Sequence, residues 1–208
     1  MNVRGIVVAG GSGTRFGGPK HSLALGGVEL WERGVTALNS AGVSDVVVVG
    51  DVPGGLPGGE RRRDSVQTGL AALPDDTDWV LIHDAARPLA SRSLVERVLG
   101  RALLGDVDGV VPAIPLADTI KKIDGELVVS TVERLGLVAV QTPQAFRFGV
   151  LKAAHAREDD DATDDAALVE RAGGRVVHVM GDPINIKITY PDDLAIARAH
   201  MESDPGDD

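Results

Sequence analysis

The chain contains no cysteine, which excludes a disulfide-stabilised scaffold, a zinc site built from thiolates and a cysteine nucleophile. It also contains no apolar run near the ~18 residues that a membrane span needs. The apolar run over residues 6–9 ends at a glycine pair and is too short for the core of a signal peptide. We therefore expect a cytoplasmic protein that does not associate with membranes.

The chain is also short of positive charge, with 21 Lys and Arg residues against 31 Asp and Glu residues and a net charge of -10. Proteins that bind duplex nucleic acid without regard to sequence need clustered Lys and Arg to replace phosphate counterions. The composition therefore disfavours nucleic acid as a partner. Any polyanionic ligand must meet a local basic site.

Length and composition indicate one ordinary folded domain. The chain has 208 residues, of which 43% are hydrophobic and 25% are charged. A chain of this length buries roughly 70% of the surface that its unfolded form exposes, so it forms a sizeable core without disulfides. We expect a single domain over residues 1–201, followed by an acidic, disordered tail over residues 202–208.

Short β-branched runs alternate with longer amphipathic stretches. The predicted strands are 3–8, 45–49, 79–83, 109–112 and 176–180, and the predicted helices are 29–41, 62–73, 91–104, 148–156, 165–172 and 191–201. Continuous apolar strands between amphipathic helices are typical of a parallel sheet covered on both faces. The pattern therefore predicts an α/β fold with a doubly wound, mostly parallel sheet.

One segment does not fit this rhythm. Residues 118–123 and 126–131 are predicted as two short strands joined by Asp124-Gly125, a pair typical of hairpin turns. Such a hairpin has no place within a doubly wound core.

A glycine-rich segment, residues 9–20, follows the first strand at the carboxyl edge, where open α/β sheets bind ligands. Its glycines let backbone N–H groups approach a phosphate chain, although a glycine cluster alone also fits a flexible turn. Phe16 breaks the dinucleotide-binding pattern, and Pro19 breaks the P-loop pattern. What remains is a glycine loop with two cations, Arg15 and Lys20, that suit a polyphosphate.

Other polar groups have both a structural and a functional interpretation. We expect at least two arginines of the triplet at 61–63 to be solvated, and Ser65 suits a helix cap. A lone His83-Asp84 pair is more often structural than catalytic, although Asp84 also suits a ribose hydroxyl or a hydrated magnesium ion. The acidic residues 158–161, 164 and 165 have the composition of a metal cluster, but a solvated loop that caps the next helix is the favoured interpretation.

Two cations further along the chain are open to both interpretations. Lys187 lies in an apolar, strand-like stretch, where its charge either meets an anion or reaches water from an edge strand. Arg134 is equally suited to a weak surface ion pair.

Seven segments together resemble, in the same order, those of the 2-C-methyl-D-erythritol 4-phosphate cytidylyltransferase (IspD) family. They are the glycine loop ending in Pro19-Lys20, segment 59–65, HDAARP from His83, DTIK from Asp118, TPQ from Thr142, TDD from Thr163 and NIKIT from Asn185. The resemblance covers nearly the whole chain. It implies a Rossmann-like nucleotidyltransferase fold and transfer of CMP from CTP to methylerythritol phosphate, releasing pyrophosphate, in the non-mevalonate route to isoprenoids.

The resemblance also implies roles for individual residues. The catalytic residues would be Arg15, Lys20, Arg134 and Lys187, and the substrate-binding residues would be Ala9, Gly10, Gly11, Gly13, Gly59, Glu60, Ser65, Asp84, Ala85, Arg87, Thr119 and Thr142. Among these, Gly59 and Ser65 would help to recognise cytosine. No residue is expected to ligate a metal, because the Mg²⁺ ion would be held mainly by the CTP phosphates.

The resemblance further implies that the hairpin is a protruding arm over about residues 115–135. In a homodimer, this arm would carry Thr119 and Arg134 into the partner's site. Two alternatives remain open. The first is a cytidylyltransferase for another polyol phosphate such as ribitol 5-phosphate, although HDAARP and DTIK favour methylerythritol phosphate. The second is a non-catalytic nucleotide-binding dimer, which would have no use for Arg15, Lys20 and Lys187 together.

Overall fold

The computed structural model describes residues 1–10, 16, 18, 23–43, 45–157 and 164–203. Its central sheet has the strand order β11 (Val176–Met180), β6 (Gly109–Pro115), β10 (Gln144–Arg147), β5 (Trp79–Asp84), β1 (Val3–Val8) and β4 (Asp45–Val49). The neighbours β4, β1 and β5 run parallel, as do β6 and β11, whereas β10 is antiparallel to both β5 and β6. The predicted doubly wound, mostly parallel sheet is confirmed.

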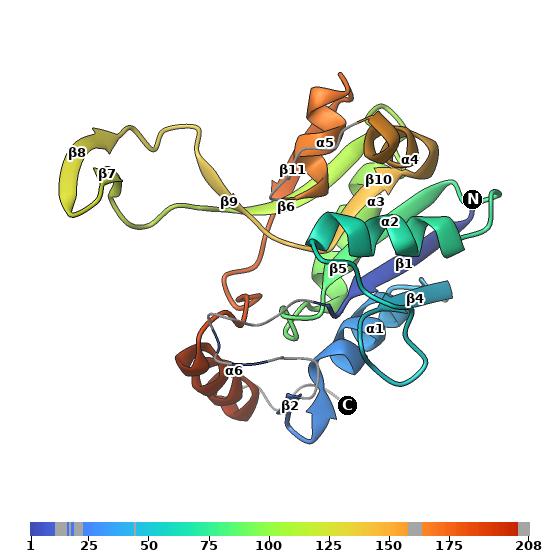
Figure 1. The fold of residues 1–208 in the computed structure, drawn as a ribbon, viewed down its shortest axis with the longest axis horizontal. Coiled ribbons are helices and arrows are strands. Elements are labelled where there is room, and N and C mark those ends of the chain that lie inside the picture. The colour runs from blue at the N-terminus through green and yellow to red at the C-terminus, as the bar shows by residue number, and fades with distance from the viewer. Residues whose placement is uncertain (11–15, 17, 19–22, 44, 158–163, 204–208) are drawn as a thin grey trace.

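Helices cover both faces of this sheet (Figure 1). Along β5, Val80 and Ile82 belong to the core with α2 (Arg62–Ala72), α4 (Phe148–Arg157) and α5 (Asp165–Arg171). The alternate residues Trp79 and Leu81 belong to the core with α1 (Leu30–Ser40) and α3 (Arg92–Ala102). Successive side chains of a strand point to opposite faces, so a continuously apolar strand fills two cores at once.

A third, smaller cluster lies beside the sheet. It packs Leu30 and Ile188 against Ala197 of α6 (Pro191–Ser203) and Leu25 of the two-stranded β2 (Ala24–Leu25) and β3 (Val28–Glu29). Helix α6 runs to Ser203, two residues past its predicted end, and residues 204–208 lie outside the described residues. Within the described chain, no helix combines the length and apolar character needed to span a bilayer.

The predicted arm is present and projects from the body of the molecule (Figure 1). It carries β7 (Ile120–Asp124) and β8 (Leu127–Val132), and β9 (Val138–Val140) returns the chain antiparallel to the end of β6. The turn is one residue later than predicted, because Asp124 pairs with Leu127 and leaves Gly125 and Glu126 as the loop. Gly125 has a φ of +55°, the left-handed value that such a two-residue turn requires.

Candidate active site

The polar groups that the sequence singles out gather where the parallel strands end. Strands β1, β4 and β5 finish at Val8, Val49 and Asp84, so the loops that follow them leave the same edge. Strand β10 runs the opposite way, which brings Thr142, two residues before its start, to this edge as well. The backbone N–H of Asp84 donates to Thr142 Oγ1 at 3.0 Å.

Asp84 is the centre of this edge. Its carboxylate accepts hydrogen bonds from Arg62 Nε at 2.9 Å on Oδ1 and from Lys187 Nζ at 2.7 Å on Oδ2. Burial is the largest influence and alone would raise the pKa of Asp84, but the two cations hold that pKa well below its usual range. Asp84 is therefore a permanent anion that fixes two positive charges at the carboxyl edge.

Lys187 meets an anion, as one of the two interpretations of this residue required. The residue is not part of a strand, so the strand-like appearance of segment 185–189 was misleading. The segment is held instead by main-chain bonds such as Ile188 N–H to the carbonyl of Ala86 at 2.8 Å. The Lys187 side chain is 41% exposed, and an ammonium group has three donors, so it can serve Asp84 and an incoming anion together.

Arg62 also belongs to the site, which the sequence did not predict. Its Nη1 donates to Asp165 Oδ2 at 2.7 Å, and Asp165 Oδ1 lies 3.0 Å from His155 Nε2. Burial alone would lower the pKa of Arg62, but the carboxylates of Asp84 and Asp165 raise it above its usual value. Arg62 thus bridges two carboxylates from distant parts of the chain.

One expectation about the charged runs is wrong, and a second holds only in part. Of the triplet at 61–63, only Arg61 is exposed. Arg62 is partly buried, and Arg63 is buried, with its Nη2 donating to the carbonyl of His155 at 2.8 Å. In the acidic run, Asp164 does cap α5 by accepting from Ala167 N–H at 3.1 Å. Asp165, however, is buried and paired rather than solvated, and residues 158–163 lie outside the described residues.

His83 has a structural role, as expected for a lone His-Asp pair. The ring is fully buried, with Nδ1 3.1 Å from Thr142 Oγ1 and Nε2 3.2 Å from the Arg87 carbonyl. A carbonyl can only accept, so Nε2 carries the proton and Nδ1 accepts from the Thr142 hydroxyl; this tautomer is assigned from the network. Burial lowers the pKa of His83 to about 4, and the ring is neutral at physiological pH.

Arg87 uses its guanidinium within the chain. Nη1 donates to the carbonyl of Asn185 at 2.8 Å, and Nη2 donates to the carbonyl of Val140 at 3.3 Å. Asn185 Nδ2 in turn donates to the carbonyl of Thr142 at 2.8 Å. These bonds tie the segment that carries Lys187 to β9 and to the loop before β10. Arg87 was predicted to bind substrate, but in this structure it holds these segments of the site together.

Three predicted binding residues, Gly10, Gly59 and Ser65, converge beside this cluster. Ser65 Oγ accepts from Gly59 N–H at 3.0 Å. A Cβ added to Gly10 would lie 3.4 Å from the same Oγ, and one added to Gly59 would collide with Asp64. Residues of the loops after β1 and β4 therefore lie around a buried hydroxyl, and the close approach of the second loop to α2 at Asp64 requires glycine at position 59.

The remaining predicted residues fall into three groups. Ala9 and Ala85 join the strand ends, since Ala9 N–H donates to the Val49 carbonyl at 2.8 Å and Ala85 N–H donates to the Val8 carbonyl at 3.0 Å. Glu60 is exposed next to Gly59. Gly11, Gly13, Arg15 and Lys20 lie outside the described residues.

Thr119 precedes β7 and Arg134 follows β8, so both lie on the arm, which projects from the body of the chain (Figure 1). Arg134 Nη1 donates to main-chain carbonyls at the arm's base, among them that of Leu116 at 3.2 Å and that of Ala117. This contact closes the two ends of the arm on each other.

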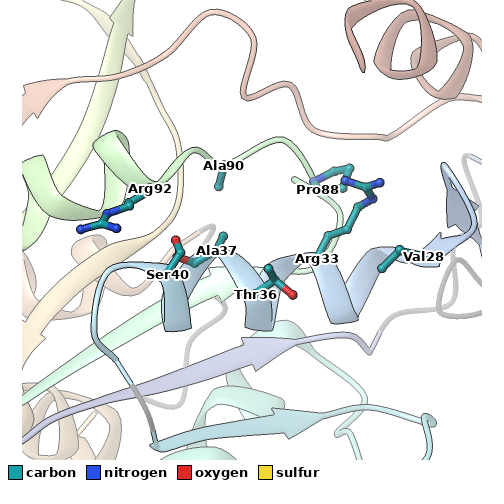
Figure 2. Close-up of a pocket in the computed structure, with 8 residues that line it drawn as sticks. All are labelled: Val28, Arg33, Thr36, Ala37, Ser40, Pro88, Ala90 and Arg92. Atoms are coloured by element: carbon teal, nitrogen blue, oxygen red, sulfur yellow. The ribbon is translucent and has the colours of Figure 1, made fainter. Parts of the chain in front are cut away.

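A separate pocket of about 290 Å³ lies between α1 and the segment that follows β5 (Figure 2). It is lined by Val28, Arg33, Thr36, Ala37, Ser40, Pro88, Ala90 and Arg92, none of which belongs to the predicted site. Figure 2 shows the guanidinium groups of Arg33 and Arg92 at opposite ends of the pocket, so they do not converge on one ligand position.

The chain is similar in sequence to known proteins. Residues 55–203 match the family model described as IspD, 2-C-methyl-D-erythritol 4-phosphate cytidylyltransferase. A bifunctional IspD/IspF enzyme of Granulibacter bethesdensis is 45% identical over 97% of this chain and 57% of its own length. A 2-C-methyl-D-erythritol 4-phosphate cytidylyltransferase of Rhodococcus jostii is 44% identical over 95% of this chain and 94% of its own length.

The same likeness holds in three dimensions. The crystal structure of the enzyme of that name from Thermus thermophilus has a TM-score of 0.82 and 34% identity, covering 95% of this chain and 98% of the other. The chain spans just over half the length of two bifunctional relatives, 57% and 56%. Against the single-function Rhodococcus relative it spans nearly the full length.

Proposed function

This chain belongs to the 2-C-methyl-D-erythritol 4-phosphate cytidylyltransferase family, and we propose that it transfers CMP from CTP to 2-C-methyl-D-erythritol 4-phosphate, releasing pyrophosphate. The reaction would belong to the non-mevalonate route to isoprenoid precursors. The observation that carries the proposal is the match of residues 55–203 to the family model. The paired charges of Asp84 and Lys187 at the carboxyl edge support it.

The nucleophile needs little activation. A phosphate monoester has a second pKa near ~6, so at neutral pH its oxygen is already anionic. That oxygen attacks the α-phosphorus of CTP, a new P–O bond forms, and the bond to the departing pyrophosphate breaks. The chain must therefore position two polyanions and offset their charge, and a general base is not needed.

Cations on this chain perform that task in the proposal. Lys187 has ammonium donors left over after its bond to Asp84, and they suit the phosphate of the polyol substrate. Arg15 and Lys20 of the glycine loop are assigned to the triphosphate and to the charge that grows in the transition state. Each such contact typically contributes about 10²- to 10³-fold in rate.

The nucleoside would lie between two loops of the same edge. Gly59 and Ser65 suit the cytosine, because the loop there closes around a fixed hydroxyl. Asp84 suits the ribose, because each carboxylate oxygen keeps a lone pair after accepting from Arg62 or Lys187. Thr142 and Ala85 hold this carboxylate in place through the backbone.

Magnesium is part of the proposal and would arrive with the nucleotide. Hard oxygen ligands and retained water are typical of Mg²⁺ sites, and the triphosphate itself supplies such oxygens. When bound, the ion would neutralise phosphate charge. Among the described residues, no group of three His, Asp or Glu side chains is placed to hold a metal ion.

We also propose a cytoplasmic homodimer that shares its two active sites. Eight large apolar side chains on and beside the arm are exposed in the single chain: Ile123, Leu127, Val128, Val129, Leu135, Leu137, Val138 and Val140. Burial against a second copy would cover them, and an exchange of arms would bring Thr119 and Arg134 to the partner's site.

The direct test is pyrophosphate release from CTP and Mg²⁺ with each candidate acceptor. We expect release with 2-C-methyl-D-erythritol 4-phosphate and little release with ribitol 5-phosphate or with no acceptor. Equal or faster turnover with ribitol 5-phosphate would assign the chain to a different polyol phosphate. Binding of CTP without any acceptor-dependent release would support the non-catalytic alternative.

A further inference from the structure

Five side chains form one continuous series of polar contacts beneath the carboxyl edge. Lys187 donates to Asp84, Asp84 accepts from Arg62, Arg62 donates to Asp165, and Asp165 contacts His155, over distances of 2.7, 2.9, 2.7 and 3.0 Å. We call this set of five side chains the Arg62 network. It connects the segment after β11, the end of β5, the first residues of α2 and α5, and His155 of α4.

The Arg62 network extends from the interior to the surface. Exposure of the side chains is 2% for His155, 1% for Asp165, 21% for Arg62, 9% for Asp84 and 41% for Lys187. The inner end is thus fixed by packing, and the outer end faces the space where an anionic substrate would arrive. The outer cation, Lys187, is the more exposed of the two and has donors to spare for that substrate.

Arginine suits the middle position because of its shape. Arg62 uses Nε for one carboxylate and Nη1 for another, so its planar fork fixes the direction of each. A lysine at this position has the charge but only a single nitrogen, on a flexible stem. The charge count matters as well, since Arg62 and Lys187 together balance Asp84 and Asp165.

We propose that Arg62, anchored by Asp165, is a positioning residue for Lys187. It occupies Oδ1 of Asp84, so the carboxylate offers Lys187 one oxygen, Oδ2, and leaves the remaining ammonium donors for substrate phosphate. Without Arg62, both oxygens turn to Lys187 and the cluster gains a net negative charge facing a polyanion. This inference rests on the proposed function for its kinetic readout.

The test is a double-mutant cycle on kcat/KM with Arg62→Met, Lys187→Met and the combined variant. Loss of the ammonium contact should cost about 10²-fold, and its misplacement by about 1 Å can cost as much. If Arg62 acts through Lys187, the combined variant also loses about 10²-fold, because the second change removes nothing further. Independent losses that multiply to about 10⁴-fold would overturn the proposal.

Arg62→Lys separates position from charge. It retains the positive charge but cannot reach both carboxylates with a fixed fork, so we expect kcat/KM to fall about tenfold or more. Parental activity in this variant would show that charge alone matters and would overturn the positioning role. Arg101→Met is the matched control, because it breaks a two-bond pair with Asp106 at the far end of α3, and it should retain activity within about twofold.

An NMR measurement, which does not depend on turnover, distinguishes failure of the positioning role from failure of the proposed function. The chain has five lysines, so the ε-methylene signal of Lys187 can be assigned by NMR. We expect the Lys187 side chain to become more mobile in Arg62→Lys and in Asp165→Asn. These two variants keep the proposal testable if Arg62→Met fails to fold. An unchanged Lys187 signal in both variants would overturn the positioning role, whereas an inactive parent with these NMR changes would overturn only the proposed function.

Discussion

Asp84 and Lys187 are 103 residues apart in the chain, yet Lys187 Nζ lies 2.7 Å from Asp84 Oδ2 at the carboxyl edge of the sheet. The pair is supported from the other side by Arg62, which takes the second oxygen of the same carboxylate. A buried anion thus keeps a surface cation in one place. This relationship leads to the first of four predictions.

Lys187→Met should lower kcat/KM by about 10²-fold, because a cation that offsets phosphate charge is lost. Asp84 keeps Arg62 as its partner, so the variant should remain folded. Steady-state kinetics with circular dichroism checks both statements. Lys152→Met is the control, since Lys152 pairs with exposed Asp75, and a similar loss of activity there would contradict a specific role for Lys187.

The free energy of unfolding should fall as the pH is lowered from about 6.5 to about 4. His83 has a pKa of about 4 in the folded chain, against 6.5 for the unconstrained side chain. As the pH falls, the unfolded chain therefore binds the proton at a higher pH than the folded chain does. The stability that this difference provides is complete above pH 6.5 and is lost between pH 6.5 and pH 4. The full shift corresponds to about 3 kcal/mol.

Urea denaturation at pH 7.5, 6, 5 and 4 measures this effect. His83→Gln is the matched variant, because its amide can accept from Thr142 and donate to the Arg87 carbonyl without titrating. It should show a flatter dependence on pH than the parent. The same slope in both proteins would assign the acid sensitivity to other groups.

Gly59→Ala should weaken CTP binding. A Cβ at this position would collide with Asp64, so the loop that donates to Ser65 must shift. Calorimetric titration with CTP checks the expected loss of about tenfold or more in affinity, equivalent to about 1.4 kcal/mol. In Gly100→Ala, the added Cβ meets no atom within 4 Å, and the helix should gain about 0.5–1 kcal/mol of stability with unchanged CTP affinity.

Arg15→Ala and Arg134→Ala should complement each other in a shared-site dimer. Each variant alone should be nearly inactive. After the two are unfolded, mixed equally and refolded, about half of the dimers contain both chains, and each mixed dimer has one intact site, which restores roughly a quarter of parental activity. If mixing restored nothing, Arg134 would act within its own chain.

The sequence predicted the parts of the fold that depend on local pattern. Strands β1, β4 and β11 begin and end as predicted, because the apolar side chains of each strand pack against the two cores, fully or partly buried. Strand β10 was missed because its four residues carry no periodic signal, and its identity depends on pairing with β5 and β6. The hairpin was predicted because it broke the pattern, although its turn was placed one residue early.

The site shows the same division between local and distant information. Asp84, Thr142 and Lys187 were predicted and do meet at one edge. Arg62 was not singled out, because its partners lie 22 and 103 residues away and a triplet of arginines normally indicates a solvated surface. A buried role for Asp165 was hidden in the same way by the acidic residues that precede it.

The central claim is transfer of CMP to an organic phosphate, and ³¹P NMR of one reaction mixture tests it most directly. CTP, Mg²⁺ and 2-C-methyl-D-erythritol 4-phosphate are incubated with the protein, and all phosphorus signals are followed together. We predict equal amounts of free pyrophosphate and of a new diphosphate diester, with matching loss of CTP and of the monoester. Pyrophosphate that accumulates with free CMP while the monoester remains unchanged would contradict the account.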